Sequence, residues 1–185
     1  ILLAGALTVS ILSGCGYNSQ PFISTEAETS SAQSTEEETP AEEILSHGGP
    51  ITVTDQIGRE VTLDAPVEKL VSSYYISTAL LIALGCEDNL VGIEMKGDTR
   101  ELYRLAAPKL LELPAVGSGK GINVEETAAL EPDVVIIPKR LEESVESFEA
   151  LGIPVIVVNP ETQEEFETCI DLLARITGTE ETGEE

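Results

Sequence analysis

Residues 130–160 read LEPDVVIIPKRLEESVESFEALGIPVIVVNP, and this stretch decides the fold. Two continuous runs rich in β-branched residues, 133–137 and 154–158, are typical of strands that are covered on both faces. Between them, residues 141–151 have helical character and are followed by Gly152, a common helix terminator. Strand, helix and strand in this order predict two parallel strands joined by a crossover helix.

The same alternation extends toward the N-terminus. Short strands are predicted at 69–73, 90–94 and 115–117. Helical spacing of apolar residues predicts a helix over 76–85, and residues 99–107 fit a second, shorter helix that stops before a proline. Alternating strands and helices indicate a parallel sheet with helices on both of its faces.

Helix starts and ends in the second half are marked by capping residues. The sequence at 123–126, Asn-Val-Glu-Glu, predicts a helix that ends at Pro132. Thr-Gln-Glu-Glu at 162–165 predicts a second capping box, with a helix that runs through Ile176 and ends at Gly178. At the other end, residues ITVTDQIGREVTL (51–63) alternate apolar and polar side chains around a glycine, which indicates a β-hairpin.

The first fifteen residues suggest export. Residues 1–12 read ILLAGALTVSIL, which is uncharged and too short to span a bilayer. Ser13 and Gly14 then precede Cys15, and this arrangement resembles a bacterial lipobox, which implies cleavage before Cys15 and a lipid on its thiol. The alternative is a frayed apolar N-terminus or a free thiol.

Residues 16–50 are predicted to form a disordered acidic tether. The segment 17–50 is rich in Ser, Thr, Glu and Pro, and contains seven Glu and no Lys or Arg. Such a composition buries too little apolar surface to offset the entropy lost on ordering. Directly after a lipidated cysteine, the tether would hold a folded domain away from a membrane. The alternative is an ordinary acidic tail.

Composition excludes several classes of protein. The chain has 34 acidic and 10 basic residues, a net charge of −24, which argues against nucleic acid as a partner. Cys86 and Cys169 lie in apolar stretches and are interpreted as small buried residues rather than a redox pair. The single histidine, His47, lies in the tether, so the sequence offers no His-dependent catalysis and no His-rich metal site.

The candidate site consists of the loops that follow the predicted strands, because ligands of such sheets bind beyond the carboxyl ends of the strands. These loops are residues 73–77, 95–97, 118–121, 138–140 and 159–160. Seven of the ten basic residues lie between Lys96 and Arg140, which favours an anionic ligand. The alternative is that these are ordinary solvated side chains.

Motifs of catalysis are not matched. The segment 117–121, Gly-Ser-Gly-Lys-Gly, is not a phosphate-binding loop, because Pro114 stands where that motif needs glycine and Gly121 where it needs Ser or Thr. The pairs Glu125–Glu126 and Glu142–Glu143 fit exposed helix faces better than acid–base chemistry. The sequence therefore gives no reason to expect an enzyme.

The order of the motifs resembles one family, the solute-binding proteins of ABC importers for iron siderophores, haem and cobalamin. The resemblance rests on the stretches VTDQIGREVTLDAPVEKLVSS (53–73), ALLIALGCEDNLVGIE (79–94), VGSGKGINVEETAALEPDVVII (116–137), FEALGIP (148–154) and LLARITGTEE (172–181). It implies a Rossmann-like α/β N-terminal lobe over residues 51–178, and residues 179–185 as the start of an interlobe helix, with the second lobe missing from a truncated chain.

The resemblance also implies a function and a set of site residues. A monomeric, lipid-anchored protein on the extracytoplasmic face of the cell membrane would capture a metal chelate and deliver it to an ABC permease, with no enzymatic activity and no cofactor. The implied ligand-facing residues are Tyr74, Tyr75, Lys96, Ser118, Gly119, Lys120, Pro138, Lys139 and Arg140. Glu125 matches a surface acid of the family that docks to basic residues of the permease.

One departure from the family leaves the ligand open. Residues 74–79, YYISTA, lack the Pro-x-x-Thr-Glu motif of many members. The ligand could be a ferric siderophore, haem or a corrinoid. Two further alternatives are a sensory or surface-adhesive lipoprotein that uses the same lobe, and a non-functional fragment.

Overall fold

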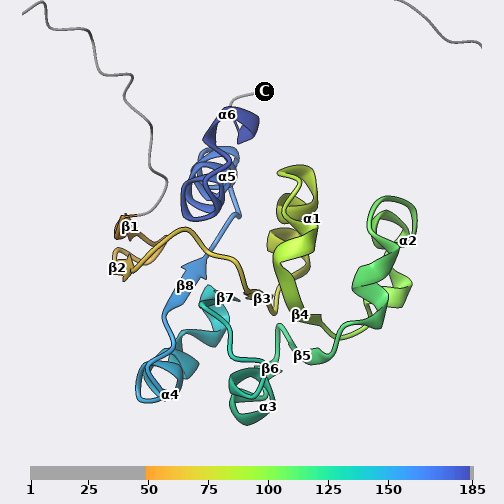
Figure 1. Ribbon diagram of the computed structural model, residues 1–185, viewed down its shortest axis with the longest axis horizontal. Coiled ribbons are helices and arrows are strands. Elements are labelled where there is room, and N and C mark those ends of the chain that lie inside the picture. The colour runs from red at the N-terminus through yellow and green to blue at the C-terminus, as the bar shows by residue number, and fades with distance from the viewer. Residues whose placement is uncertain (1–48, 184–185) are drawn as a thin grey trace, which may run out of the picture. The chain divides into compact units, whose positions relative to one another are not determined.

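A six-stranded sheet organises the part of the chain that the structure, a computed structural model, describes: residues 49–183 (Figure 1). The strand order is β6-β5-β4-β3-β7-β8, and a separate two-stranded hairpin is formed by β1 and β2. The strands are β1 (Ile51–Thr54), β2 (Glu60–Leu63), β3 (Leu70–Ser72), β4 (Leu90–Glu94), β5 (Ala115–Ser118), β6 (Gly121–Ile122), β7 (Val134–Pro138) and β8 (Val155–Val158).

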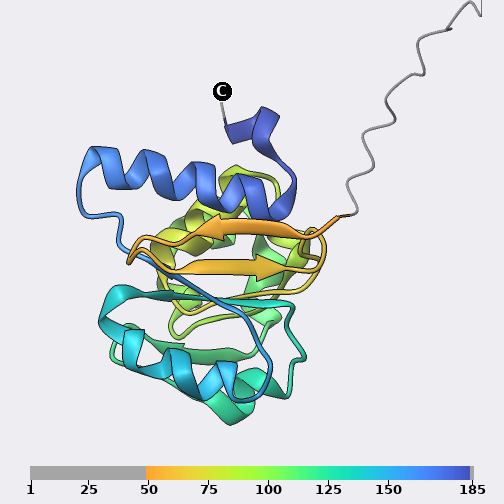
Figure 2. The same ribbon diagram turned by 90° about the vertical axis from the view of Figure 1, so that its left-hand side faces the viewer.

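Helices cover both faces of this sheet. The α-helices are α1 (Tyr75–Ala83), α2 (Glu101–Ala106), α3 (Val124–Ala128), α4 (Val145–Glu149), α5 (Gln163–Thr177) and α6 (Glu180–Gly183). Short 3-10 helices are η1 (Glu87–Asn89), η2 (Gly97–Thr99), η3 (Pro108–Glu112) and η4 (Lys139–Ser144). In Figure 1, α1 and α5 lie on one side of the sheet and α3 and α4 on the other, while Figure 2 shows the hairpin alongside α5.

Alternate residues of the strands feed two separate hydrophobic cores. In β7, Val134 and Ile136 face the core formed with α1, α2 and α5. Val135 and Ile137 face the core formed with α3 and α4. All four are completely buried, which explains why this strand reads as a continuous apolar run rather than an alternating one.

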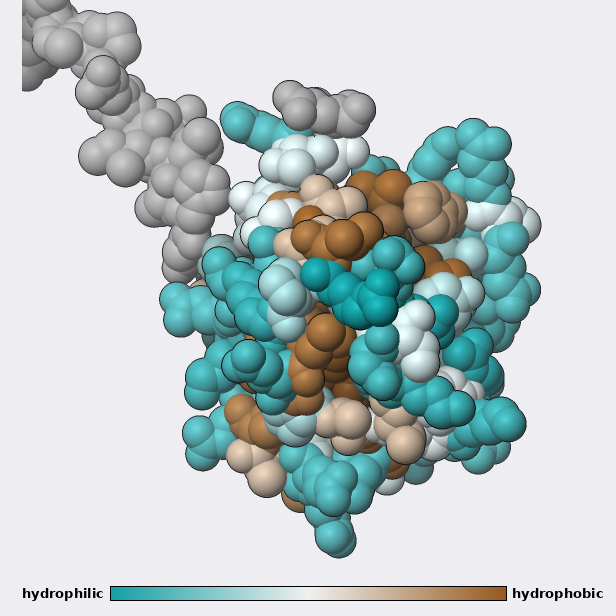
Figure 3. Space-filling model, turned by 90° about the vertical axis from the view of Figure 1, so that its right-hand side faces the viewer, coloured by the Kyte–Doolittle hydropathy of each residue, from teal (hydrophilic) through white to brown (hydrophobic). Residues whose placement is uncertain are grey.

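The outer face beside α2 is less completely covered. Leu102 and Leu105 of α2 and Leu111 of η3 are exposed large apolar side chains. Figure 3 views the molecule from this side and shows brown apolar side chains interspersed with teal polar ones.

The expected α/β class is confirmed, with one addition to the sheet. The strands β5, β4, β3, β7 and β8 pair in parallel. The sequence did not indicate β6, which pairs antiparallel with β5 across a tight turn and makes the sheet mixed. The expected helix over 141–151 is divided into η4 and α4, and 3-10 turns are common at helix N-termini.

The capping predictions have different outcomes. Thr162 accepts a hydrogen bond from the Glu165 N–H, and the Glu165 carboxylate accepts one from the Thr162 N–H, so the predicted capping box is complete. At Asn123 only the first half forms, from the Glu126 N–H at 3.2 Å. Asn123 therefore caps the helix as predicted, while its own N–H pairs with the Val116 carbonyl at 2.8 Å instead of with the Glu126 carboxylate.

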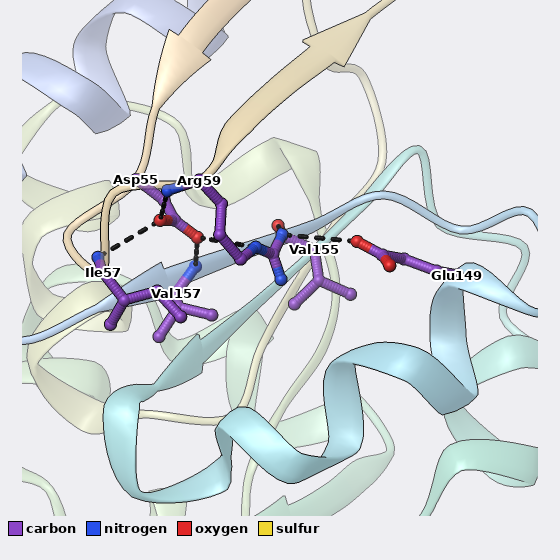
Figure 4. Close-up of polar contacts among 6 residues, drawn as sticks. All are labelled: Asp55, Ile57, Arg59, Glu149, Val155 and Val157. Atoms are coloured by element: carbon purple, nitrogen blue, oxygen red, sulfur yellow. Dashed lines mark hydrogen bonds and ion pairs between the residues drawn. The ribbon is translucent and has the colours of Figure 1, made fainter.

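The hairpin is joined to the edge of the sheet through the turn between β1 and β2 (Figure 4). The buried Asp55 carboxylate accepts hydrogen bonds from the N–H groups of Ile57, Arg59 and Val157 at 3.2, 2.9 and 3.3 Å. The Arg59 guanidinium donates to the Val155 carbonyl at 2.8 Å and lies 3.4 Å from Asp55. These contacts pair polar groups of β8 that an open sheet edge would leave free.

A neighbouring residue of the same turn reaches the loop after β8. Gln56 accepts a hydrogen bond from the Asn159 N–H at 2.7 Å and donates to the Glu165 carbonyl at 2.6 Å. The hairpin therefore fixes both the last strand and the chain that leaves it.

Several earlier predictions fall wholly or largely outside the described residues. Cys15, the lipobox and all but the last two residues of the tether lie within residues 1–48. Within residues 49–183, no helix combines the length and apolar character needed to cross a membrane. Cys86 and Cys169 are both buried, as expected, and neither forms a disulfide. Burial raises the pKa of the Cys169 thiol to about 12.

Candidate functional site

A hollow of about 660 Å³ lies at the carboxyl ends of β3, β4 and β5, where the fold predicts a ligand site. Three loops and one side chain enclose it, because the residues that follow neighbouring parallel strands emerge at the same edge. Its lining is Ser73, Tyr74, Tyr75, Glu94, Met95, Lys96, Thr99, Arg100, Ser118, Gly119, Lys120 and Arg140.

Two adjacent tyrosines form one wall of the hollow. Tyr74 is the N-cap residue of α1 and has an extended backbone, and Tyr75 is the first residue of that helix. Their rings meet edge to face, with centroids 5.2 Å apart and planes at 75°. Tyr75 is 42% exposed and Tyr74 is half-buried, so both present ring surface at the site. Burial raises the pKa of the Tyr74 phenol, and Arg140 opposes this shift.

Each tyrosine is covered by an arginine from a different part of the chain. The Arg100 guanidinium carbon lies 4.2 Å from the centroid of the Tyr75 ring, and that of Arg140 lies 4.9 Å from the Tyr74 ring. Both distances are within the range of cation–π attraction. The result is a row of four side chains in which two cations flank two aromatic rings.

Two lysines add positive charge at the rim. Lys96 has φ = 66°, a left-handed conformation that is uncommon for a residue with a side chain, and it is exposed two residues after the end of β4. Lys120 is exposed in the two-residue turn between β5 and β6. Within residues 49–183, no carboxylate lies within 4.0 Å of the charged nitrogens of Lys96, Arg100, Lys120 or Arg140. These charges are therefore not neutralised by a described partner.

The carboxylate in the lining of the hollow, Glu94, is held by hydroxyl groups beneath it. Glu94 is 5% exposed, and its two oxygens accept hydrogen bonds from Thr78 at 2.8 Å and from the Tyr103 phenol at 2.7 Å. Burial and the Glu94 carboxylate raise the pKa of Tyr103, so its phenol stays protonated and donates. This network joins β4, α1 and α2 directly below the two tyrosines.

A second hollow of about 350 Å³ adjoins the first. Its lining is Tyr74, Pro138, Lys139, Arg140, Glu142, Val158, Asn159, Pro160 and Glu161. Tyr74 and Arg140 line both hollows, so the two hollows meet at these residues.

A third hollow, of about 440 Å³, lies at the opposite ends of the strands, beside Pro66 and Asp133. The Asp133 carboxylate there accepts hydrogen bonds from the N–H groups of Glu68 and Lys69 at 3.0 and 2.8 Å. Its charged group is thus occupied by the backbone, and it offers less to a ligand than the row of cations and rings.

The structure brings most of the expected site residues together. Tyr74, Tyr75, Lys96, Ser118, Gly119, Lys120 and Arg140 line the larger hollow, and Pro138 and Lys139 line the smaller one. Glu125 lies elsewhere, exposed in the first turn of α3.

Arg100 and Glu94 also line the larger hollow, although neither was predicted as a site residue. Residues 99–107 were predicted to be helical, which hid Arg100, but α2 begins at Glu101 and Arg100 precedes it with an extended backbone. Glu94 was predicted as the end of a strand. Its position at the carboxyl end of that strand was the available signal.

Comparison with known proteins identifies relatives of this chain. Residues 70–185, more than half of the chain, match the family described as Periplasmic binding protein. The vitamin B12-binding protein of Yersinia pestis is 32% identical over 113 residues, 58% of this chain and 37% of that protein. The uncharacterised ABC transporter substrate-binding lipoprotein YvrC of Bacillus subtilis is 26% identical over 136 residues, 71% of this chain and 41% of that protein.

A third relative has a solved structure. The molybdate-binding protein MolA of Haemophilus influenzae is 26% identical over 115 residues, 60% of this chain and 33% of that protein. Its molybdate-bound structure superposes with a TM-score of 0.67 at 21% identity, covering 72% of this chain and 48% of that one. The chain thus spans about a third to two fifths of the length of these curated relatives.

The family match covers the sheet from β3 onward and includes every residue that lines the two hollows. The hairpin that precedes it is attached to β8 of the same sheet. The chain therefore belongs to the periplasmic binding protein family.

Proposed function

We propose that this chain is the substrate-binding component of an ABC importer, and that it captures an anionic metal chelate and delivers it to a membrane permease. A ferric siderophore, haem and a corrinoid are the candidate chelates. The observation that supports this most strongly is the row of two arginines and two tyrosines along the larger hollow. Among the relatives, the vitamin B12-binding protein supports a chelate as the ligand, and the molybdate-binding protein supports an anionic one.

The chemistry of the row suits such a ligand. Guanidinium groups form strong, charge-assisted hydrogen bonds with carboxylates and other oxyanions. The tyrosine rings offer flat apolar surface with a polar tip, which fits the organic shell of a chelate. The cations lie in a chain of net charge −24, so the hollow would be a local attraction for anions on an otherwise repulsive surface.

Anchoring and docking complete the proposal. A lipid on Cys15 and a tether over residues 16–50 would hold a monomeric domain at the extracytoplasmic face of the membrane. Glu125 would dock to basic residues of the permease, and its exposure on α3 leaves the side chain available for that contact. The name of the lipoprotein YvrC supports membrane attachment.

The test is a titration of this chain with ferric siderophores, haem, cyanocobalamin and molybdate, followed by tyrosine fluorescence. We expect saturable binding of at least one of them, weakened about tenfold by Arg100→Gln, because one charged contact is lost. Arg104→Gln is the matched control, since Arg104 lies on the exposed side of α2 and pairs with Glu101 at 3.2 Å. No saturable binding, or equal effects of the two variants, would contradict the proposal.

A further inference from the structure

Arg140 occupies an unusual position between the two hollows. It follows β7 in η4, yet its side chain crosses to the turn between β5 and β6, where its Nε donates a hydrogen bond to the Gly119 carbonyl at 2.5 Å. On the way it lies over the Tyr74 ring. Both Arg140 and Tyr74 line the hollow of about 660 Å³ and the hollow of about 350 Å³.

Gly119 is what allows the side chain to lie there. A Cβ placed on Gly119 would be 1.9 Å from one terminal nitrogen of Arg140 and 2.5 Å from its Nε and Cζ. Atoms cannot approach so closely, so any other residue at this position would displace the guanidinium. Gly119 is not one of the glycines with positive φ in the described part of the chain, so its backbone does not itself require glycine.

The contact is also weak enough to open. Arg140 is exposed, and no carboxylate within residues 49–183 lies within 4.0 Å of its guanidinium. Its guanidinium contacts the Gly119 carbonyl and the face of the Tyr74 ring. A ligand oxyanion would be a stronger partner for the guanidinium than a neutral carbonyl.

From these observations we infer that Arg140 is a movable partition that sets the size of the ligand. Bound to Gly119, it separates the two hollows and limits the ligand to the larger one. When the Arg140 side chain is released from Gly119, the two hollows become one, and its guanidinium can turn toward a larger anion. This inference rests on the proposed function, because it specifies how the same site selects its ligand.

Two substitutions separate the position of Arg140 from its charge. Gly119→Ala displaces the guanidinium and keeps it in the protein. Arg140→Ala removes both the partition and the charge. Gly121→Ala is the matched control in the same turn, because a Cβ on Gly121 meets nothing within 4 Å.

The first measurement needs no ligand. Exchange of the Arg140 Nε–H with water, followed by NMR, reports whether the bond to Gly119 is formed. We expect the exchange to be slower in the wild type and in Gly121→Ala than in Gly119→Ala, where the bond cannot form. Equal exchange rates in all three proteins would overturn the partition.

The second measurement compares a small anion, molybdate, with a large one, haem. We expect Gly119→Ala to shift the ratio of the two dissociation constants about tenfold in favour of haem, since haem no longer has to break a charged hydrogen bond. Arg140→Ala should shift the ratio in the same direction while weakening both ligands. Gly121→Ala should leave the ratio unchanged.

The outcomes distinguish this inference from the proposed function. Binding of a probe with the same ratio in Gly119→Ala and the wild type overturns the partition and leaves the proposed function in place. Failure of both probes, and of the siderophores and cyanocobalamin, to bind any of these proteins overturns the proposed function and the role of Arg140 in ligand size together.

Discussion

Two arginines of this chain, Arg59 and Arg140, have the same side chain and opposite surroundings. The Arg59 guanidinium lies 3.4 Å from Asp55 and 3.5 Å from Glu149, and it donates to the Val155 carbonyl (Figure 4). Arg140 meets one carbonyl and one tyrosine ring, and no described carboxylate lies within 4.0 Å of it. The charge of Arg59 is neutralised within the fold, whereas the charge of Arg140 remains available to a ligand.

The difference separates residues that hold the fold from residues that are available to a ligand. At the hairpin, buried polar groups pair with one another, so removing one leaves others unsatisfied. At the ligand edge, Lys96, Lys120 and Arg140 are exposed, so removing one of them costs the fold little. An expected effect on stability or on binding can therefore be assigned to each residue from its partners.

The largest effect on stability is expected for Asp55→Ala. The substitution leaves three backbone N–H groups without their acceptor and the Arg59 guanidinium without its nearer carboxylate. We expect the free energy of unfolding to fall by about 3 kcal/mol, which urea denaturation would measure. Asp64→Ala, at an exposed position after β2, should change it by less than about 0.5 kcal/mol. Equal effects of the two substitutions would show that the turn does not hold the hairpin.

The sequence predicted the central strands and the ends of two helices well, because the signals there are local, whereas α3 ends at Ala128 and not at Pro132 as predicted. The apolar runs at 133–137 and 154–158 became β7 and β8, and Gly152 and Gly178 end helices with φ of 76° and 72°. The attachment of the hairpin was beyond such reasoning. Asp55 and Val157 are 102 residues apart, and the sequence around Asp55 contains no signal that predicts this hydrogen bond.

The loops that form the candidate site could be predicted from the sequence, but the contacts between their side chains could be predicted less well. Parallel strands deliver their following residues to one edge, so Tyr74, Lys96 and Arg140 could be grouped in advance. The crossing of Arg140 to Gly119 could not, because it depends on the absence of a Cβ at one position of a turn whose second strand, β6, was not foreseen.

An intermediate effect on stability is expected for Tyr103→Phe, which tests the hydrogen bond that holds Glu94 in the lining of the larger hollow. Loss of the hydrogen bond to Glu94 should lower the free energy of unfolding by about 2 kcal/mol at neutral pH. A loss of this size would show that the buried Glu94–Tyr103 contact stabilises the fold, as the contacts of Asp55 in the hairpin do. The exposed cations of the site would then be the residues that contribute little to stability. If the free energy of unfolding does not change measurably, then Tyr103, like Arg140, contributes little to the stability of the fold.

The same residue predicts a pH dependence. Burial and Glu94 raise the pKa of Tyr103 in the folded protein, whereas an unfolded tyrosine has a pKa of about 10. Above about pH 10 the unfolded state therefore loses a proton that the folded state retains, and stability falls as the pH rises further. Urea denaturation at about pH 8 and pH 11 should show a steeper decline in the wild type than in Tyr103→Phe. Identical declines would exclude a buried, protonated phenol.

The smallest effects test the comparison of the two arginines directly. Arg59→Gln removes the contacts with Asp55, Glu149 and Val155, and we expect it to lower the free energy of unfolding by about 1 kcal/mol, since the side chain is partly exposed. Arg140→Gln should change it by less than about 0.5 kcal/mol and should act on ligand binding instead. Thermal or urea denaturation of both variants in one buffer decides this. If Arg140→Gln destabilises the protein as much as Arg59→Gln, then the contact with Gly119 is part of the fold, and Arg140 cannot be the residue that moves to meet a ligand.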